Sequence, residues 1–153
     1  MSTDAREALM MEIGTESSAW QDDVQRFDAA AAAMLGVNTT DLRCASLLMH
    51  RSLTAKELAQ ATGLTPGAVT TVLDRLEEAK LARRQYDEKD RRRVLMELTA
   101  TGRKKIDEIW GPLVKDGMAM MRKYSTEELE RVRDFVKKVR AVQLQHIARV
   151  EQK

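Results

Sequence analysis

Residues 54–102 read TAKELAQATGLTPGAVTTVLDRLEEAKLARRQYDEKDRRRVLMELTATG, and this stretch decides the fold. Its first part has the pattern of two short helices joined by a tight turn, and its second part that of two strands joined by a basic loop. This order is typical of a helix-turn-helix with an appended β-hairpin, or wing. A helix and a positively charged hairpin that lie side by side can enter neighbouring grooves of one DNA duplex.

The residues at the helix ends indicate where each of the two helices begins and stops. Thr54 and Glu57 have the spacing of a capping box, and Gly63 offers the left-handed conformation that ends a helix. Thr65 is predicted to cap the second helix, with Pro66 in its first turn, where a missing N–H costs nothing. The apolar residues of the second helix repeat at helical spacing and should face inward: Val69, Val72, Leu73 and Leu76.

The opposite face of the second helix carries small, hydroxylated and basic side chains. Such a face can approach base edges closely, because a threonine there can donate or accept a hydrogen bond or place its methyl group against that of thymine. We predict that five residues meet the major groove or adjacent phosphates: Thr65, Gly67, Thr70, Thr71 and Arg75.

Beyond Leu81 the apolar period becomes alternating, which predicts strands over 81–84 and 94–98 on either side of a loop. Arginines in that loop can reach phosphates or a narrow minor groove, where the potential is most negative. We interpret Asp87 and Asp90 as the partners that orient the arginine side chains. The predicted wing contacts come from three consecutive residues: Arg91, Arg92 and Arg93.

The net charge of +2 conceals an uneven distribution along the chain. Residues 1–41 hold eight acidic and two basic side chains, a net −6, whereas residues 80–105 hold ten basic and four acidic side chains, a net +6. The positive charge coincides with the hairpin, where a surface that follows a phosphate backbone would need it. This coincidence favours a nucleic-acid partner over a basic face that is merely solvated.

The same residues carry a family resemblance. The segments LTAKELAQATGL (53–64) and TVLDRLEEAKLARR (71–84), with Asp87-x-x-Asp90-Arg91-Arg92 and Leu98-Thr99-x-x-Gly102, resemble the MarR family of bacterial winged-helix transcriptional regulators. The match covers about a third of the chain. One departure is Ala79-Lys80, where the family often has glycine before the apolar residue, and it should alter the turn that leaves the recognition helix.

Further helices are predicted on the N-terminal side of this segment. An apolar stripe over 15–35 predicts a helix that ends at Gly36, with Gly14 separating it from a short helix or arm over 3–13. Another helix is expected to start near Thr40, and Ser52-Leu53 to add a short strand.

On the C-terminal side, a long helix is predicted from Thr99 to about Tyr124. Pro112 lies inside it, so we expect a kink or break near Ile109. Ser125 and Glu128 have the spacing of another capping box, which should start the last helix.

The predicted fold is therefore mainly α with a small antiparallel β-hairpin wing. We expect an N-terminal dimerisation helix or arm over 1–37, a winged helix-turn-helix DNA-binding domain over 38–102 and C-terminal dimerisation helices over 103–153. The terminal helices carry apolar stripes that a core of about 60 residues cannot cover alone, although packing within one chain remains an alternative.

The resemblance implies a homodimer in which the terminal helices of two chains interleave. Two recognition helices would then lie about one DNA turn apart, ~34–36 Å, and the two-fold axis would favour a pseudo-palindromic operator on double-stranded DNA. The resemblance also implies a pocket for a small aromatic or phenolic effector that weakens DNA binding. The candidate ligand-binding residues are Trp20, His50 and Trp110, for each of which burial in the core is the simpler explanation.

Other chemistry has little support in the sequence. Cys44 lacks a second cysteine to resolve an oxidised thiol and does not match the sensing position of the family, which favours an inert core residue. His50 and His146 have no ligand cluster at metal-binding spacing, so we expect no metal and no cofactor. No nucleophile elbow, phosphate loop or paired-carboxylate motif indicates an enzyme.

The chain is expected to act in the cytoplasm, because it has one cysteine, no secretory signal pattern and no apolar run that approaches the ~18 residues of a membrane span. We predict a ligand-responsive, homodimeric, sequence-specific regulator, most simply a repressor. Two alternatives remain open: a winged-helix protein-docking module, which would need an apolar exposed face over 66–79, and an architectural DNA binder without an effector.

Overall fold

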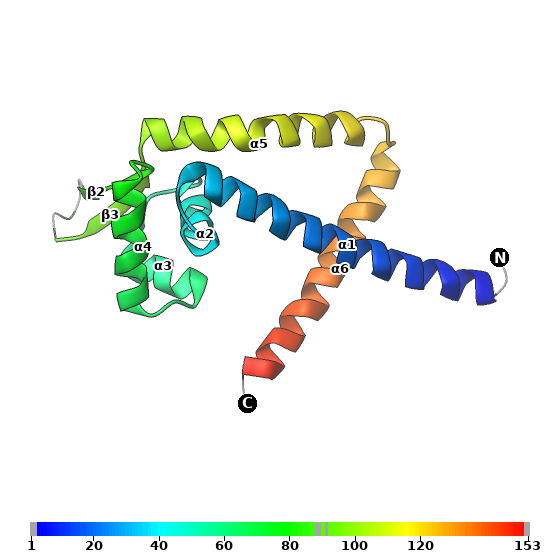
Figure 1. The fold of residues 1–153 in the computed structure, drawn as a ribbon. Coiled ribbons are helices and arrows are strands. Elements are labelled where there is room, and N and C mark those ends of the chain that lie inside the picture. Colours follow the sequence, from blue (N-terminus) through cyan, green and yellow to red (C-terminus); the bar gives the residue numbers. More distant parts are fainter. Residues whose placement is uncertain (1–2, 88–89, 91, 152–153) are drawn as a thin grey trace. The chain divides into compact units, whose positions relative to one another are not determined.

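The computed structural model describes residues 3–87, 90 and 92–151. Their elements follow in the order α1 (Thr3–Leu35), α2 (Thr39–Leu48), β1 (Leu53–Thr54), α3 (Ala55–Thr62), α4 (Pro66–Glu78), β2 (Ala82–Tyr86), β3 (Val94–Leu98), α5 (Ala100–Met121) and α6 (Thr126–Glu151) (Figure 1). The predicted fold class, mainly helical with a small antiparallel wing, is confirmed. The chain divides into two compact units, one up to Ile109 and one from Trp110, which are described separately.

α1 is one continuous helix, so the predicted break at Gly14 is wrong. A single glycine costs a helix about 1 kcal/mol, which is too little to interrupt a segment of otherwise good helix formers. The helix ends at Gly36, as predicted, in the left-handed conformation with φ of 71°. Only its last turns are buried, through Ala31, Ala32 and Leu35, and these pack against α2.

The helical core of the first unit is built where the sequence pattern places it. α2 begins at Thr39, one residue before the predicted start, and Leu42, Cys44, Ala45 and Leu48 are buried in it. The four inward-facing residues predicted for α4, Val69, Val72, Leu73 and Leu76, are likewise buried. For α4, helical periodicity was therefore sufficient to identify the face that packs against the core.

The predicted caps of the helix-turn-helix are confirmed. The backbone N–H of Thr54 donates to Glu57 Oε2 at 2.7 Å, and the N–H of Glu57 donates to Thr54 Oγ1 at 3.2 Å. The first of these bonds lowers the pKa of the Glu57 carboxyl below its usual range. Gly63 ends α3 with φ of 73°, Thr65 caps α4 and Pro66 is its first residue.

The three strands form an antiparallel sheet in the order β1-β3-β2. Ala82 pairs with Leu98 and Tyr86 with Val94, which sets the register of the wing. β3 has the predicted bounds, and the expected short strand is β1, which lies one residue later than predicted and pairs Leu53 with Met96. β2 begins one residue after the predicted start and continues two residues beyond the predicted end, because Gln85 and Tyr86 add no apolar alternation that the sequence could reveal.

The sheet is joined to α5 by a close backbone contact. The N–H of Thr99 donates to the carbonyl oxygen of Leu81 at 3.0 Å, and the N–H of Gly102 donates to Thr99 Oγ1 at 2.9 Å. Thr99 thus caps α5 while it pairs with the residue before β2. These bonds account for the Leu-Thr-x-x-Gly spacing of the sequence.

The segment from Trp110 comprises the last part of α5 and all of α6. α5 runs through Pro112 without a break, so a break near Ile109 is wrong, while a kink stays a prediction. The capping box of α6 is confirmed: the N–H of Ser125 donates to Glu128 Oε2 at 2.8 Å, and the N–H of Glu128 to Ser125 Oγ at 3.2 Å. Among the described residues, no helix is long and apolar enough to cross a lipid bilayer.

Candidate nucleic-acid interface

The first two turns of α4 present a low, polar surface to solvent. Thr65, Gly67, Thr70 and Thr71 are all exposed there. Thr65 Oγ1 accepts a hydrogen bond from the N–H of Ala68 at 3.3 Å. The free N–H groups of a helix start favour a phosphate nearby. Four of the five predicted contact residues of this helix therefore lie together on one accessible surface.

The two threonine hydroxyls have a fixed direction. Thr70 Oγ1 donates to the carbonyl oxygen of Pro66 at 3.1 Å, and Thr71 Oγ1 donates to that of Gly67 at 3.2 Å. Each hydroxyl oxygen keeps lone pairs that can accept a hydrogen bond from a base or sugar, and each methyl group remains available for apolar contact.

Gly67 has no steric role within the described part of the chain. A Cβ atom built on it would meet no atom within 4 Å, and its helical φ does not require glycine. A helix position that could hold alanine but holds glycine loses about 0.5–1 kcal/mol of stability. Its absence of a side chain lets an external surface approach the backbone of α4 closely.

Arg75, the fifth predicted residue of α4, is held by a carboxylate from α2. Its Nε donates to Asp41 Oδ2 at 2.8 Å and its Nη2 to Asp41 Oδ1 at 2.6 Å. The Asp41 side chain is 0% exposed, whereas that of Arg75 is 40% exposed. The hydrogen bonds that Arg75 donates to Asp41 raise the pKa of Arg75 above its usual value, so the guanidinium stays charged.

The sequence interpretation missed Asp41. Its spacing from Asn38 was a visible signal, because the two form a capping box: Asn38 Oδ1 accepts from the N–H of Asp41 at 2.9 Å, and the N–H of Asn38 donates to Asp41 Oδ2 at 3.2 Å. Its pairing with Arg75 spans 34 residues, and no local pattern reveals it.

The wing presents Arg92 and Arg93 to solvent. The N–H of Arg92 donates to Asp90 Oδ1 at 3.0 Å, and the N–H of Asp87 donates to the carbonyl oxygen of Arg93 at 3.0 Å. Asp90 thus acts on the loop backbone, whereas Asp87 lies 3.7 Å from the Arg93 guanidinium, as expected for an orienting partner. Arg91 lies outside the described residues.

Within the described part of the chain, the Arg92 guanidinium has no carboxylate partner, while other arginines near the wing are already paired. Arg83 Nε donates to Glu97 Oε1 at 2.7 Å, and Arg84 Nη2 donates to Asp74 Oδ1 at 2.6 Å. Arg84 also bonds to Glu77, so it ties β2 to α4 and neutralises two acids of that helix. Sequence reasoning missed this link, which removes negative charge beside the exposed face of α4.

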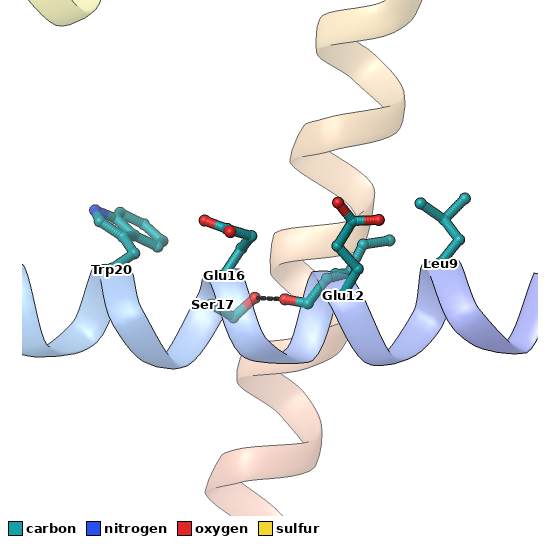
Figure 2. A pocket seen from close by; sticks show the side chains of 6 residues that line it. Leu9, Glu12, Glu16, Ser17 and Trp20 are labelled. Atoms are coloured by element: carbon teal, nitrogen blue, oxygen red, sulfur yellow. Dashed lines mark hydrogen bonds between the residues drawn. The ribbon is translucent and has the colours of Figure 1, made fainter.

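The three candidate ligand-binding residues lie on different elements. Trp20 belongs to α1 and is 66% exposed, His50 is exposed after α2, and Trp110 is half-buried in α5. Trp20 lines an open hollow with Leu9, Glu12, Ile13, Glu16 and Ser17, all from α1 (Figure 2). Neither His50 nor Trp110 is part of its described lining.

Two further kinds of site were considered in the sequence: a metal site and a reactive thiol. Over residues 3–87, 90 and 92–151, no three histidine, cysteine or acidic side chains gather as metal ligands. Cys44 is completely buried, and burial, with the negative charge of Asp41, raises the pKa of its thiol. A neutral, inaccessible thiol is a poor nucleophile, which supports the interpretation of Cys44 as a core residue.

Comparison with known proteins agrees with this geometry. A family model described as the MarR family matches residues 35–93, from the end of α1 to the wing. The HTH-type transcriptional regulator YcgE of Bacillus subtilis is 39% identical over 127 residues, covering 82% of each chain. The HTH-type transcriptional repressor MdtR of the same organism is 42% identical over 65 residues, covering 42% of each chain.

Solved structures share the fold over most of their length. YusO of B. subtilis has 26% identity and a TM-score of 0.64, covering 92% of this chain and 99% of that one. A mutant of S. aureus MepR bound to an oligodeoxyribonucleotide has 20% identity and a TM-score of 0.59, covering 86% of this chain and 97% of that one. The chain belongs to the MarR family and is a DNA-binding transcriptional regulator.

Proposed function

We propose that this regulator is a homodimeric repressor that binds a pseudo-palindromic operator and is released by a small aromatic or phenolic ligand. The observation that carries the proposal is the exposed face of α4 beside the wing. The exposed side chains of α4 are small, polar or acidic, with Pro66 at its start, so no apolar patch is available for docking a protein. Arg92 is an accessible cation of the adjacent wing, and its guanidinium has no carboxylate partner among the described residues.

In this proposal α4 enters the major groove and the wing follows the neighbouring backbone or minor groove. The N-cap and three residues of α4 meet base edges or phosphates: Thr65, Gly67, Thr70 and Thr71. Wing contacts come from the three arginines of the loop: Arg91, Arg92 and Arg93. Arg75 belongs to the same surface, and its contribution is considered below. A repressor role is supported by the identity with MdtR, which is named a repressor.

The homodimer is supported by α6, a 26-residue helix with no buried residue in the structure. Its exposed apolar side chains recur every three or four positions and include Val132, Phe135, Val136, Val139 and Val142. A stripe of this extent normally marks an interface, and a second copy supplies a self-complementary surface. We therefore assign residues 1–37 and 103–153 to dimerisation and residues 38–102 to DNA binding.

Release by a ligand is supported by the hollow on α1. Leu9, Glu12, Glu16 and Trp20 project from the same side of the helix (Figure 2). An aromatic effector could stack on Trp20 if a dimer partner closed this surface. The ligand would reduce DNA affinity only by its preference for a dimer with the wrong spacing between recognition helices.

The experiment that tests DNA binding is fluorescence anisotropy with two labelled duplexes, one from the promoter beside the regulator's own gene and one of scrambled sequence. Preference for the promoter duplex supports a sequence-specific regulator. Equal affinity for the two duplexes supports an architectural DNA binder, and absence of binding to both contradicts the proposal.

Dimerisation and ligand release need separate measurements. Sedimentation velocity should give the mass of two chains, and a purely monomeric protein would contradict the homodimer. A thermal-shift series with small aromatic acids should raise the melting temperature if a ligand binds the folded dimer. A ligand so identified must also lower the anisotropy of the promoter complex.

A further inference from the structure

Asp41 is the one buried charged residue in the part of the chain that the structure describes. Removing a carboxylate from water costs several kcal/mol unless partners compensate it. Asp41 has such partners on both oxygens, because Oδ1 accepts from Arg75 Nη2, and Oδ2 accepts from Arg75 Nε and the N–H of Asn38. The carboxylate is therefore fixed in position by α2 and forms a two-bond ion pair with one side chain of α4.

The ion pair with Asp41 lies on the side of α4 that also carries Gly67 and Thr71. Arg75 follows Gly67 and Thr71 at intervals of four residues, so these three positions lie along one side of the helix. A two-bond contact between a guanidinium and a carboxylate allows a single planar arrangement. The apolar contacts beneath α4, through Val69, Val72 and Leu76, have no comparable direction. The ion pair thus restrains the rotation of α4 about its own axis.

Asp41 also links the orientation of α4 to the positions of α1 and α2. α2 packs against the last turns of α1 as well as against α4. The capping box with Asn38 fixes the first turn of α2, where Asp41 lies. The orientation of α4 is thereby fixed relative to α2, which packs against both α1 and α4.

We propose that Asp41 is a positioning residue for DNA recognition. It holds Arg75, and through Arg75 it holds α4 in the rotation that turns Gly67, Thr70 and Thr71 toward the groove. Arg75 then acts on DNA through Asp41 and not by neutralising a phosphate. This inference rests on the proposed function, because it concerns how the recognition helix is presented to an operator.

Three variants test the inference: Asp41→Asn, which keeps the shape and the helix cap; Arg75→Gln, which removes the charge; and the double variant. Arg75→Lys keeps the charge but loses the two-bond fork, and it serves if Asp41→Asn does not fold. The control is Cys44→Ala, which removes buried atoms from the same helix and no charge. Urea unfolding establishes that each variant is folded at the assay temperature.

The readout is anisotropy with the promoter and scrambled duplexes at several salt concentrations. We expect each single variant to weaken promoter binding by about tenfold or more while scrambled binding changes little, and the double variant to be no weaker than either. Arg75→Lys should resemble Asp41→Asn. The slope of log affinity against log salt should stay unchanged in all of them, and Cys44→Ala should bind as the wild type does.

Direct contact of Arg75 with a phosphate predicts other results and would overturn the inference. Arg75→Gln would then flatten the salt slope by about one, and Asp41→Asn would leave affinity unchanged or raise it by freeing the guanidinium. The effects of Asp41→Asn and Arg75→Gln would add in the double variant. Failure of the proposed function is distinguishable, because the wild-type protein itself would then bind neither duplex.

Discussion

Gly102 lies against the backbone of Leu81 so closely that a Cβ atom on it would come within 2.1 Å of the Leu81 carbonyl oxygen. This oxygen accepts the N–H of Thr99 and belongs to the residue that precedes β2, so it cannot move without disturbing the sheet. The contact fixes the start of α5 against the base of the wing.

Gly102→Ala should therefore lower the free energy of unfolding by about 1–3 kcal/mol or more, because the clash is with backbone atoms and not with a flexible side chain. Urea denaturation measures the loss. The matched control is Gly14→Ala, where an added Cβ meets open space. That variant should gain about 0.5–1 kcal/mol. Equal stability of the two variants would contradict the role assigned to Gly102.

Gly67→Ala should separate folding from DNA binding. The Cβ has room within the protein, so stability should stay the same or rise by about 0.5–1 kcal/mol. Affinity for the promoter duplex should fall by about tenfold, because the methyl group would stand between the backbone of α4 and the groove. Gly117→Ala in α5 is the control, and affinity that is unchanged in both variants would show that α4 does not approach DNA at Gly67.

Arg92→Ala should weaken binding to promoter and scrambled duplexes alike and flatten the salt slope by about one, because its accessible guanidinium would neutralise one phosphate. The control is Arg83→Ala, whose guanidinium is already bonded to Glu97 at 2.7 Å. The Arg83 variant should keep the wild-type slope. A slope that is the same in wild type and Arg92→Ala would remove Arg92 from the interface.

These predictions depend on features that differ in how far the sequence reveals them. Caps and inward-facing residues are set by neighbours within about a turn, so Thr54, Gly63 and Thr65 could be recognised directly. The candidate contact residues could be recognised as small, polar or basic positions on the remaining face. Such local rules need no knowledge of the tertiary structure.

Tertiary partners could not be predicted in the same way. The Asp41–Arg75 pair joins residues 34 positions apart. The ion pairs of Arg84 with Asp74 and Glu77 depend on how β2 lies beside α4. Gly14 does not interrupt α1, because its local cost is small beside the stability of a 33-residue helix. Local patterns identified the elements, but the charges that hold the elements together required the structure.

Lys80 occupies the turn after α4 with φ of 59°, a left-handed conformation that costs a residue with a Cβ about 1 kcal/mol or more. Lys80→Gly should relieve this strain and raise the free energy of unfolding by about 1 kcal/mol, less the entropy that glycine adds to the unfolded chain. Lys80→Ala removes the same charge but keeps the strain. A gain in Lys80→Ala as large as in Lys80→Gly would assign the effect to charge and not to backbone conformation.

Cys44 should make stability depend on pH in alkaline solution. Burial and the charge of Asp41 raise the pKa of the folded thiol, whereas the unfolded thiol ionises near its ordinary pKa of about 8.5. The folded state therefore holds its proton more tightly. The associated stability is fully present below the unfolded pKa and is lost as the pH rises through the folded pKa.

Urea unfolding at pH 7 and pH 10 should show a smaller decline in the free energy of unfolding for Cys44→Ala than for wild type. The same decline in both proteins would mean that the thiol ionises equally well in the folded chain, in which case iodoacetamide should also modify native Cys44.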